Sequence, residues 1–497
     1  MSFLTRRKSI DVMQALEAHE KLKPTLGWPH LMALGVGAIV GTGIYTLVGV
    51  AAGMAGPAVM LSFLLAGAVC VCAALAYAEM ATMIPVSGSA YTYSYAVMGE
   101  GTAWVVGWSL ILEYTVVCSA VAVGWSGHAA EFLRPMGVPD ALLAAPQLPI
   151  APFLHSLGVP SAWLTSFIPA AGAVHGIINL PAVVISLIVT GLLVVGTRES
   201  ATVNVILVAV KIVALVVFVV IALPHFDAGH FKPFMTHGLY EVSKDPTTGA
   251  LLKLGVAPAA AIIFFAFYGF DTISTAAEEA KNPARDLKIG IVGSMVACTI
   301  IYMVVAAAAV GAVPVAEFAK DSAPLVYVMN KLGNPTVAAL VAGAAVVALP
   351  TVILAFLYGQ SRIFFVMARD RLLPKALSKV SARTGGPVLM TVITGVIVAV
   401  MSGFATLGDL AALANAGTLA AFIAVCLAMM ILRVREPNRP RVFRAPVWWL
   451  IGPAGIVGCI LLFASLSTFT QIAFVIWNLV GVVLYLAYGR RKSLLAQ

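Results

Sequence analysis

Long apolar runs with few or no charged residues constrain this chain more than any other feature of its sequence. Residues 295–313 carry no charged side chain, and residues 203–223 carry a single one, Lys211. A helix of about 20 such residues matches the ~30 Å hydrocarbon core of a bilayer. The chain of 497 residues is 61% hydrophobic and only 10% charged. One soluble core cannot bury that much apolar surface, because cores stop growing near about 250–300 residues. The runs therefore predict an all-α integral membrane protein.

The alternation of apolar runs and polar breaks predicts twelve transmembrane helices. Residues 1–27 contain basic side chains but no apolar core of a signal peptide, so we expect a cytoplasmic N-terminal segment there. Residues 490–497 are expected to form a cytoplasmic tail. The predicted spans are residues 28–50, 57–83, 101–133, 178–197, 201–223, 256–280, 289–313, 335–368, 386–403, 408–432, 447–464 and 472–489.

The distribution of basic residues predicts which side of the membrane each loop faces. If the N-terminus is cytoplasmic, 23 of the 30 Lys and Arg residues fall on the cytoplasmic side and six fall outside. Basic residues concentrate on the cytoplasmic side of membrane proteins. We therefore expect a multi-pass protein of the cell (inner) membrane with both termini cytoplasmic. The same rule accounts for the net charge of +9 without nucleic acid as a partner.

Two of the predicted spans are interrupted by glycine near mid-depth. Residues 35–43 of the first span contain four glycines, and the sixth span contains Gly269. These spans are five spans apart in chain order, so the second set of five is expected to be inverted relative to the first. Paired broken helices in inverted halves mark the binding site of secondary transporters. The pattern predicts inverted repeats over residues 28–223 and 256–432, followed by two extra helices within 447–489.

The glycine-rich breaks also predict what the site binds. Unwound backbone within a bilayer is tolerated only where it lines a protein or water cavity. Freed N–H groups suit a carboxylate and freed carbonyls suit an ammonium, so two adjacent breaks around Gly41 and Gly269 suit the zwitterion of an amino acid. The alternative is that glycines such as Gly37 and Gly41 only allow close helix packing.

Three segments resemble the amino acid–polyamine–organocation superfamily, and within it the cationic amino acid transporter family, bacterial type. They are GVGAIVGTGIYTLVG at 35–49, FFAFYGFDTISTAAEEAKNPARDLKIGI at 264–291 and GQSRIFFVMARDRLLP at 359–374. The likeness covers nearly the whole chain, in order. It implies the leucine-transporter fold, a five-plus-five inverted repeat with broken helices 1 and 6, followed by two further spans.

The resemblance also implies which groups hold the substrate. The main-chain N–H groups of Thr42 and Gly43 would bind its carboxylate. The carbonyls of Ile39, Phe265 and Tyr268 would bind its ammonium group.

Two tyrosines depart from the family pattern near these positions. Tyr268 stands where a smaller aliphatic residue is expected, and Tyr45 stands where phenylalanine is expected. Their hydroxyls would narrow the pocket or add a contact, so the side chain of the substrate stays open between small neutral and cationic amino acids.

Lys211 lies in the middle of the fifth predicted span. Ionisable residues within spans are costly and mark function, and burial favours the neutral amine, so Lys211 is a candidate proton carrier. By the resemblance, a lysine on span five takes the place of a sodium ion beside span one in proton-coupled members. The alternative is a static ammonium that pins span five to carbonyls of span one. Both interpretations argue against sodium coupling.

Two acidic residues also lie within or beside predicted spans. We expect Glu113 in the third span to face the cavity, where it would attract a basic side chain or take part in proton movement. The alternative is a carboxyl group hydrogen-bonded to nearby backbone or tyrosine. Asp271 follows the second break by two residues, and aspartate is favoured at helix N-caps, so we expect it to cap the next helix.

Charged residues gather at the predicted cytoplasmic ends of spans six and eight. We expect them to form an inner gate of solvated ion pairs, which contribute little individually. The expected members are Glu79, Glu278, Glu279, Lys281, Arg285, Asp286, Arg362, Arg369, Asp370 and Arg371.

Two broken helices, a midplane site and a buried charge predict a secondary active transporter. No catalytic triad, nucleotide-binding motif or metal-ligand spacing is present in the sequence, so we expect neither an enzyme nor a cofactor, and no obligate protein partner is indicated. The expected activity is proton-coupled symport of small neutral or cationic L-amino acids by alternating access. The alternatives are an amino acid/amine exchanger and a transporter-like amino acid sensor.

Overall fold

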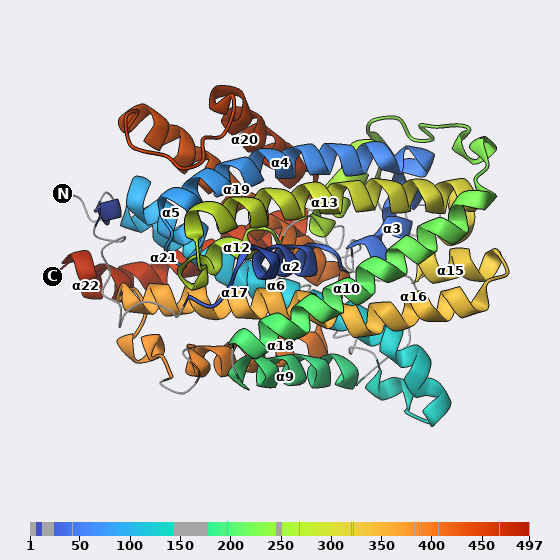
Figure 1. Cartoon of the computed structure of the whole chain (residues 1–497), viewed down its shortest axis with the longest axis horizontal. Coiled ribbons are helices and arrows are strands. Elements are labelled where there is room, and N and C mark those ends of the chain that lie inside the picture. Colours follow the sequence, from blue (N-terminus) through green and yellow to red (C-terminus); the bar gives the residue numbers. More distant parts are fainter. Residues whose placement is uncertain are drawn as a thin grey trace.

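The computed structural model of the chain is a bundle of long helices that run along its longest dimension (Figure 1). It describes residues 6–11, 24–41, 43–143, 177–195, 197–244, 251–267, 269–319, 321, 323–381, 384, 386–405, 407–466 and 468–496. Both ends of the chain lie at the same end of the bundle (Figure 1). We call that end the terminal face.

The helices of the N-terminal half are long, except where the first is interrupted. They are α2 (Trp28–Ile39), η2 (Gly43–Leu47), α3 (Val48–Ala55), α4 (Val59–Met83), α5 (Ala90–Val97), α6 (Glu100–Leu133), α9 (Leu180–Val195) and α10 (Thr197–Ala222). A short antiparallel hairpin of β1 (Glu241–Lys244) and β2 (Leu251–Leu254) follows, in which Glu241 is opposite Leu254.

The C-terminal half begins with an interrupted helix. Its first helices are α11 (Val256–Ile263), η9 (Phe264–Ala266), α12 (Thr272–Thr275), η10 (Ala277–Glu279), α13 (Pro283–Ala312), α14 (Val315–Phe318) and α15 (Pro324–Lys331). The chain continues through α16 (Pro335–Ala348), α17 (Pro350–Arg369), α18 (Val388–Phe404), α19 (Leu407–Arg435), α20 (Trp448–Ser465), α21 (Thr468–Leu484), η12 (Tyr485–Gly489) and α22 (Arg490–Lys492).

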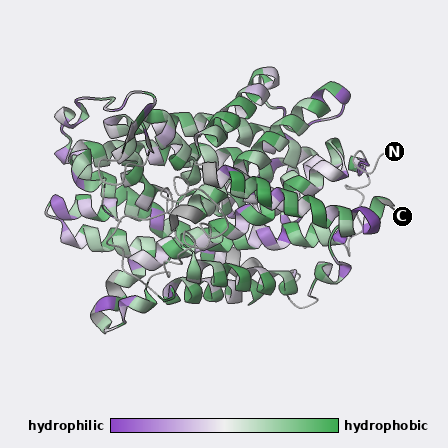
Figure 2. Cartoon of the chain, turned by 180° about the vertical axis from the view of Figure 1, so that it is seen from behind, coloured by the Kyte–Doolittle hydropathy of each residue, from purple (hydrophilic) through white to green (hydrophobic). Residues whose placement is uncertain are grey.

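Eight helical segments in the described part of the chain are long and apolar enough to cross a membrane, and three shorter apolar helices accompany them. Hydrophobic residues dominate the long helices, and the most hydrophilic stretches lie mainly toward the two ends of the bundle (Figure 2). This distribution is what a bilayer around the middle of the molecule requires.

Proline explains the main difference from the predicted spans. The single span predicted over residues 335–368 is two helices, α16 and α17, which meet at Leu349. Pro350 has no N–H to continue the hydrogen-bond ladder, so it begins a new helix instead. The structure also adds α5, an unpredicted short helix at the terminal face, all of whose residues are buried.

Burial separates a central group of helices from a peripheral one. The most apolar window of α6 is 89% buried, because α6 packs against α17, α18 and α19. The corresponding window of α20 is 22% buried and that of the segment beginning with α21 is 17% buried. The apolar outer helices are thus exposed to the surroundings, as lipid-facing helices are, and the polar machinery lies around α6, α10 and α17.

Candidate functional site

The first break separates α2 from η2. The helix ends at Ile39, Val40 is extended with φ −75° and ψ 96°, and helical structure resumes at Gly43. The last carbonyls of α2 therefore have no partner further along the same helix. They have to be satisfied by side chains from other helices, because no water is available in a bilayer core.

The second break separates η9 from α12. Gly269 has φ +125°, a conformation that side-chain-bearing residues rarely adopt. The chain then resumes as α12 at Thr272 and continues into η10, which carries Glu278 and Glu279. Both glycine-marked breaks predicted from the sequence are present.

The two breaks touch each other through their glycines. A Cβ added at Gly43 would overlap Ala266, and a Cβ added at Gly269 would lie 2.7 Å from the Cβ of Ala38. The Tyr302 hydroxyl of α13 lies 2.6 Å from the Ile39 carbonyl and 2.9 Å from the Ala266 carbonyl. The absence of side chains at Gly43 and Gly269 therefore lets two unwound segments, more than 200 residues apart in sequence, share one location.

Lys211 of α10 satisfies the carbonyls that the first break sets free. Its Nζ lies 2.8 Å from the Gly37 carbonyl, 2.5 Å from the Val40 carbonyl and 2.8 Å from the Thr351 Oγ1. An ammonium group has three N–H donors, and each has an acceptor here. Lys211 is fully buried, and no carboxylate in the described part of the chain pairs with it.

Asn204, two helical turns before Lys211, aligns α10 with α2. Its Nδ2 donates to the Ala33 carbonyl at 3.0 Å. Because residues seven apart lie on the same helix face, both polar side chains of α10 face α2. The third acceptor of Lys211, Thr351, lies at the start of α17. Its hydroxyl also lies 3.1 Å from the Gly37 carbonyl.

Asp271 accepts a hydrogen bond from the backbone of the second break, but its side chain does not cap α12 as the sequence predicts. It occupies the N-cap position of α12, yet its side chain does not bond to the first turn of that helix. Asp271 Oδ1 instead accepts from the Gly269 N–H at 3.1 Å, and Oδ2 accepts from the Tyr114 hydroxyl of α6. The carboxylate points back to the unwound segment because that segment has free N–H groups of its own.

Glu113, on the same helix as Tyr114, is fully buried near Asp271. Neither of its oxygens accepts a well-formed hydrogen bond from the residues that the structure describes, so the alternative of a backbone or tyrosine partner is not supported. Glu113, Val117 and Val121 are spaced four residues apart on α6 and thus share one face. Val117 and Val121 line the cavity described next, and Glu113 lies one turn closer to the terminal face.

A small cavity lies between the two breaks. Its volume is about 10 Å³, roughly the space of one water molecule. An amino acid therefore enters only if the walls move apart, so the structure shows a closed conformation. The cavity is lined by Ala38, Ile39, Gly41, Gly43, Val117, Val121, Phe265, Val352 and Phe356.

The structure therefore brings together most of the residues predicted to bind substrate. Ile39, Gly41, Gly43 and Phe265 line one cavity, and Gly269 packs directly against its wall at Ala38. Thr42 and Tyr268, the other two predicted contacts, lie outside the described residues.

Two buried ion pairs join the segment after the second break to α17. Glu279 of η10 pairs with Arg362 of α17 at 3.0 Å, and Glu278 pairs with Arg369 at 3.0 Å. The Arg362 and Glu279 side chains are both 2% exposed, so this pair is buried and not solvated as expected. A buried charge needs a partner, and both glutamates of η10 find one on α17.

Glu79 does not join these pairs, although the sequence places it in the same gate. Its carboxylate binds Arg433 at 2.7 Å, Arg441 at 3.1 Å and the Ala445 N–H at 2.8 Å. It therefore ties the end of α4 to the end of α19 and the connection that follows. Charge alone could not distinguish these locations, because both lie at the same end of the bundle.

Comparison with known proteins agrees with this arrangement. The sequence profile described as amino acid permease matches residues 26–487. The chain belongs to the amino acid permease family. It is therefore a multi-pass membrane protein of the transporter class, and the resemblance to the superfamily that includes the cationic amino acid transporters is confirmed.

Individual members of the permease family resemble the chain over most of its length. It is 41% identical over 498 residues to the branched-chain amino acid permease BcaP of Bacillus subtilis, covering 99% of both chains. It is 36% identical over 498 residues to the methylthioribose transporter of the same organism, covering 100% of both chains. It is 35% identical to cationic amino acid transporter 3, mitochondrial, of Arabidopsis thaliana, over 87% of this chain and 67% of that one. These relatives are named permeases and transporters, not enzymes.

Three polar residues near the two breaks escaped the sequence analysis. Thr351, Tyr302 and Tyr114 each contribute one hydroxyl group from a mainly apolar helix, and a single hydroxyl there is as typical of packing as of function. Only their proximity to the breaks distinguishes them. The one local signal was Pro350, which begins α17 and places Thr351 in its first turn.

Proposed function

We propose that this permease is a proton-coupled symporter that takes up small neutral or cationic L-amino acids by alternating access. The observation that carries the proposal is the position of Lys211, whose Nζ lies within 2.8 Å of two carbonyls freed by the first break. The ammonium occupies the place where a coupling cation would otherwise bind. Its proton is thus the natural coupled ion.

The proposed architecture has twelve spans in two inverted sets of five, with two added at the C-terminus. The apolar segment Trp28–Met83 contains two of these spans, because α3 ends at Ala55 and α4 begins at Val59. The three shorter apolar helices supply the remaining spans. Both interrupted helices then fall at the first position of their set, as inverted-repeat transporters require. In this proposal both termini, and therefore the terminal face, are cytoplasmic in the cell (inner) membrane.

The hydrogen-bond count at Lys211 supports a coupling mechanism. The ammonium form has three N–H donors for its three acceptors, whereas the neutral amine has only two. Loss of the proton therefore removes one of the three N–H donors and weakens the contacts that join α10 to α2 and α17. We infer that this loosening lets α2 move relative to α10 as the proton is released to the cytoplasm.

The cavity walls support a preference among the possible substrates. Val117, Val121, Val352 and Phe356 present only apolar atoms next to the break, which suits an aliphatic side chain. Glu113, one turn toward the cytoplasm, is the nearest candidate for a cationic side chain or for a second proton. We therefore place neutral aliphatic amino acids first, in line with the branched-chain permease among the relatives.

The carboxylate and ammonium of the substrate are proposed to bind the main chain at the breaks. The N–H groups of Thr42 and Gly43 would hold the carboxylate, and the carbonyls of Ile39, Phe265 and Tyr268 would hold the ammonium. In the closed conformation the Tyr302 hydroxyl already lies 2.6 Å from the Ile39 carbonyl. The substrate ammonium would replace that donor as the cavity opens.

Purified protein in proteoliposomes tests this function. We expect accumulation of radiolabelled alanine, valine or leucine when an inward proton gradient is imposed, and none when a proton ionophore is added. Uptake that depends only on amino acid preloaded inside the vesicles would instead identify an exchanger. Saturable binding without any accumulation would identify a sensor.

A further inference from the structure

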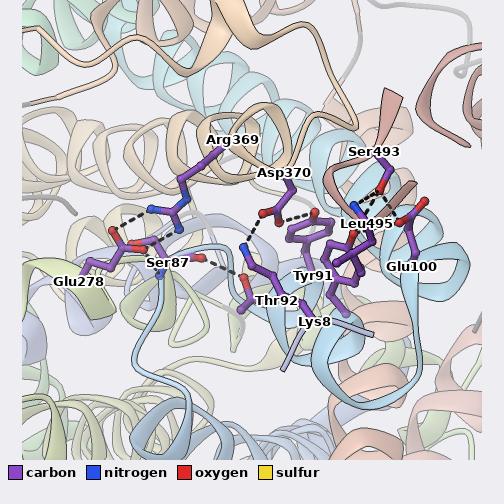
Figure 3. Close-up of polar contacts among 11 residues, drawn as sticks. Lys8, Ser87, Tyr91, Thr92, Glu100, Glu278, Arg369, Asp370, Ser493 and Leu495 are labelled. Carbon is purple, nitrogen blue, oxygen red and sulfur yellow. Dashed lines mark hydrogen bonds and ion pairs between the residues drawn. The ribbon is translucent and has the colours of Figure 1, made fainter. Parts of the chain in front are cut away.

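Two buried carboxylates at the terminal face each contact both ends of the chain. Glu100 is the first residue of α6, and Asp370 directly follows α17. Glu100 is 0% exposed and Asp370 is 2% exposed. Figure 3 shows them on either side of Tyr91, with Lys8 from the N-terminal segment beside Asp370 and Ser493 from the C-terminal tail beside Glu100.

Glu100 binds the tail through its side chain. Its Oε2 accepts from the Ser493 hydroxyl at 2.5 Å and from the Tyr95 hydroxyl at 3.0 Å, and its Oε1 accepts from the Tyr485 hydroxyl at 2.8 Å. No cation pairs with this carboxylate in the part of the chain that the structure describes. Among the described residues, the Ser493 hydroxyl is therefore one of three side-chain donors that satisfy this buried charge. The N-terminal segment is bound by the same residue, since the Glu100 N–H donates to the Arg6 carbonyl at 2.8 Å.

Asp370 also contacts both ends of the chain, but its side chain binds the N-terminal segment and its backbone binds the C-terminal tail. Its carboxylate binds Lys8 at 2.6 Å and the Tyr91 hydroxyl at 2.9 Å, so the side chain holds the N-terminal segment. Its backbone carbonyl accepts from the Leu494 N–H at 3.1 Å and holds the C-terminal tail. Ser493 and Leu494 therefore bridge the start of α6 and the end of α17.

The end of α17 that receives the tail also carries the gate. Arg369, one residue before Asp370, pairs with Glu278 beyond the second break, and Glu278 also accepts from the Ser87 N–H at 3.1 Å (Figure 3). The tail contacts at Asp370 therefore hold the end of α17 against α5 and α6, in the position from which Arg369 meets Glu278. Opening toward the cytoplasm, which alternating access demands, separates Glu278 from Arg369.

We propose that residues Ser493–Leu495, the C-terminal latch, form an intramolecular brace that fixes the end of α17 where Arg369 pairs with Glu278, and so holds the cytoplasmic face closed. The inference rests on the proposed alternating-access function. The latch docks at a site on its own chain made by Glu100, Asp370, Tyr95 and Tyr485. It stabilises the closed conformation by supporting this gate pair, and so shifts the balance between the closed and open conformations.

A cysteine at Thr275 tests the latch. Thr275 lies between the second break and Glu278 and is fully buried in the closed conformation. The rate at which a membrane-impermeant maleimide labels Thr275→Cys in inside-out vesicles then reports opening toward the cytoplasm. The same vesicles without Thr275→Cys give the background of the six native cysteines.

Three changes to the latch are compared in the protein that carries Thr275→Cys. Ser493→Ala removes one donor to a charged acceptor and is expected to raise the labelling rate about tenfold. Ser493→Asp places a second carboxylate beside Glu100, and deletion of residues 493–497 removes the latch, so both should raise it at least as much. Ser465→Ala is the matched control, since the Ser465 hydroxyl bonds only within its own helix, to Leu461 at 2.9 Å, and it should leave the rate unchanged.

The outcomes separate the latch from the proposed function. The proposal is overturned if the Ser493→Asp and truncated proteins are monodisperse and their Thr275→Cys is labelled at the same rate as in the protein with an unaltered latch. If truncation prevents folding, Ser493→Ala alone decides it. Uptake is measured on the unaltered chain in right-side-out vesicles. Its failure would refute transport while the labelling rates still judge the latch.

Discussion

Both breaks interrupt a helix, but side chains of opposite charge hold the backbone groups that they free. At the first break the freed carbonyls of α2 are held by a cation, Lys211, and at the second the freed N–H of Gly269 is held by an anion, Asp271. Each charge is opposite in sign to the helix end that it meets, because carbonyl ends are negative and N–H ends are positive. The two breaks therefore differ in the side chains that hold them.

This difference assigns different tasks to the two breaks. Lys211 is bound by neutral acceptors from two other helices and holds three bonds only when protonated. Asp271 is supported by the Tyr114 hydroxyl and the backbone of its own segment. We infer that the first break couples transport to the proton and that the second mainly keeps its shape.

Removal of the cation at the first break should have the largest effect. Lys211→Ala leaves the Gly37 and Val40 carbonyls without their donor, and it removes the proposed proton site. We expect pH-driven accumulation to fall to the level of empty vesicles. The matched control is Lys331→Ala, since Lys331 is an exposed lysine paired with Glu317. Full gradient-driven uptake by Lys211→Ala would refute the coupling role.

A methyl group between the breaks should have the next largest effect. Gly43→Ala places a Cβ where Ala266 already lies, and overpacking of this kind costs roughly 1–3 kcal/mol. We expect substrate binding, measured by thermal stabilisation or calorimetry, to weaken by about 10- to 100-fold. Gly127→Ala in α6 is the control, because no atom lies within 4 Å of its added Cβ. Unchanged affinity in Gly43→Ala would refute the carboxylate site at this break.

Neutralising the second break should cost less. Asp271→Asn keeps an oxygen for the Gly269 N–H but removes the charge, and we expect about a tenfold loss of uptake rate, because a hydrogen bond to a charged group is worth more than a neutral one. The dependence of uptake on the proton gradient should survive. Asp227→Asn, at an exposed cap whose carboxylate accepts from the Gly229 N–H at 2.7 Å, is the control. Complete loss of gradient dependence in Asp271→Asn would reverse the assignment of the two breaks.

The smallest effect is expected at Thr351. Thr351→Ala removes one neutral acceptor from Lys211, and Thr351→Ser retains it. We expect uptake to fall roughly fivefold in the alanine variant and to recover in the serine variant. Thr299→Ala serves as the control, since the Thr299 hydroxyl bonds only to Met295 in its own helix. Equal uptake rates for Thr351→Ala and Thr351→Ser would show that the hydroxyl does not assist Lys211.

Local pattern was enough to predict the helices, the two breaks and the buried position of Lys211. Apolar runs, glycines and an isolated lysine are properties of neighbouring residues, and the bilayer makes helices the only solution for such runs. The predicted contacts Ile39, Gly41, Gly43 and Phe265 accordingly line one cavity.

Which residues pair with each other, in contrast, depended on how the helices pack in the bundle. Lys211 finds its acceptors 140 to 174 residues away in sequence, Glu79 binds Arg433 instead of the gate, and the two ends of the chain meet at Glu100 and Asp370. The sequence cannot distinguish charged residues that lie at the same depth in the membrane. Depth follows from hydropathy, but lateral position follows from how the helices pack. That lateral position decides which buried charge is paired with which partner.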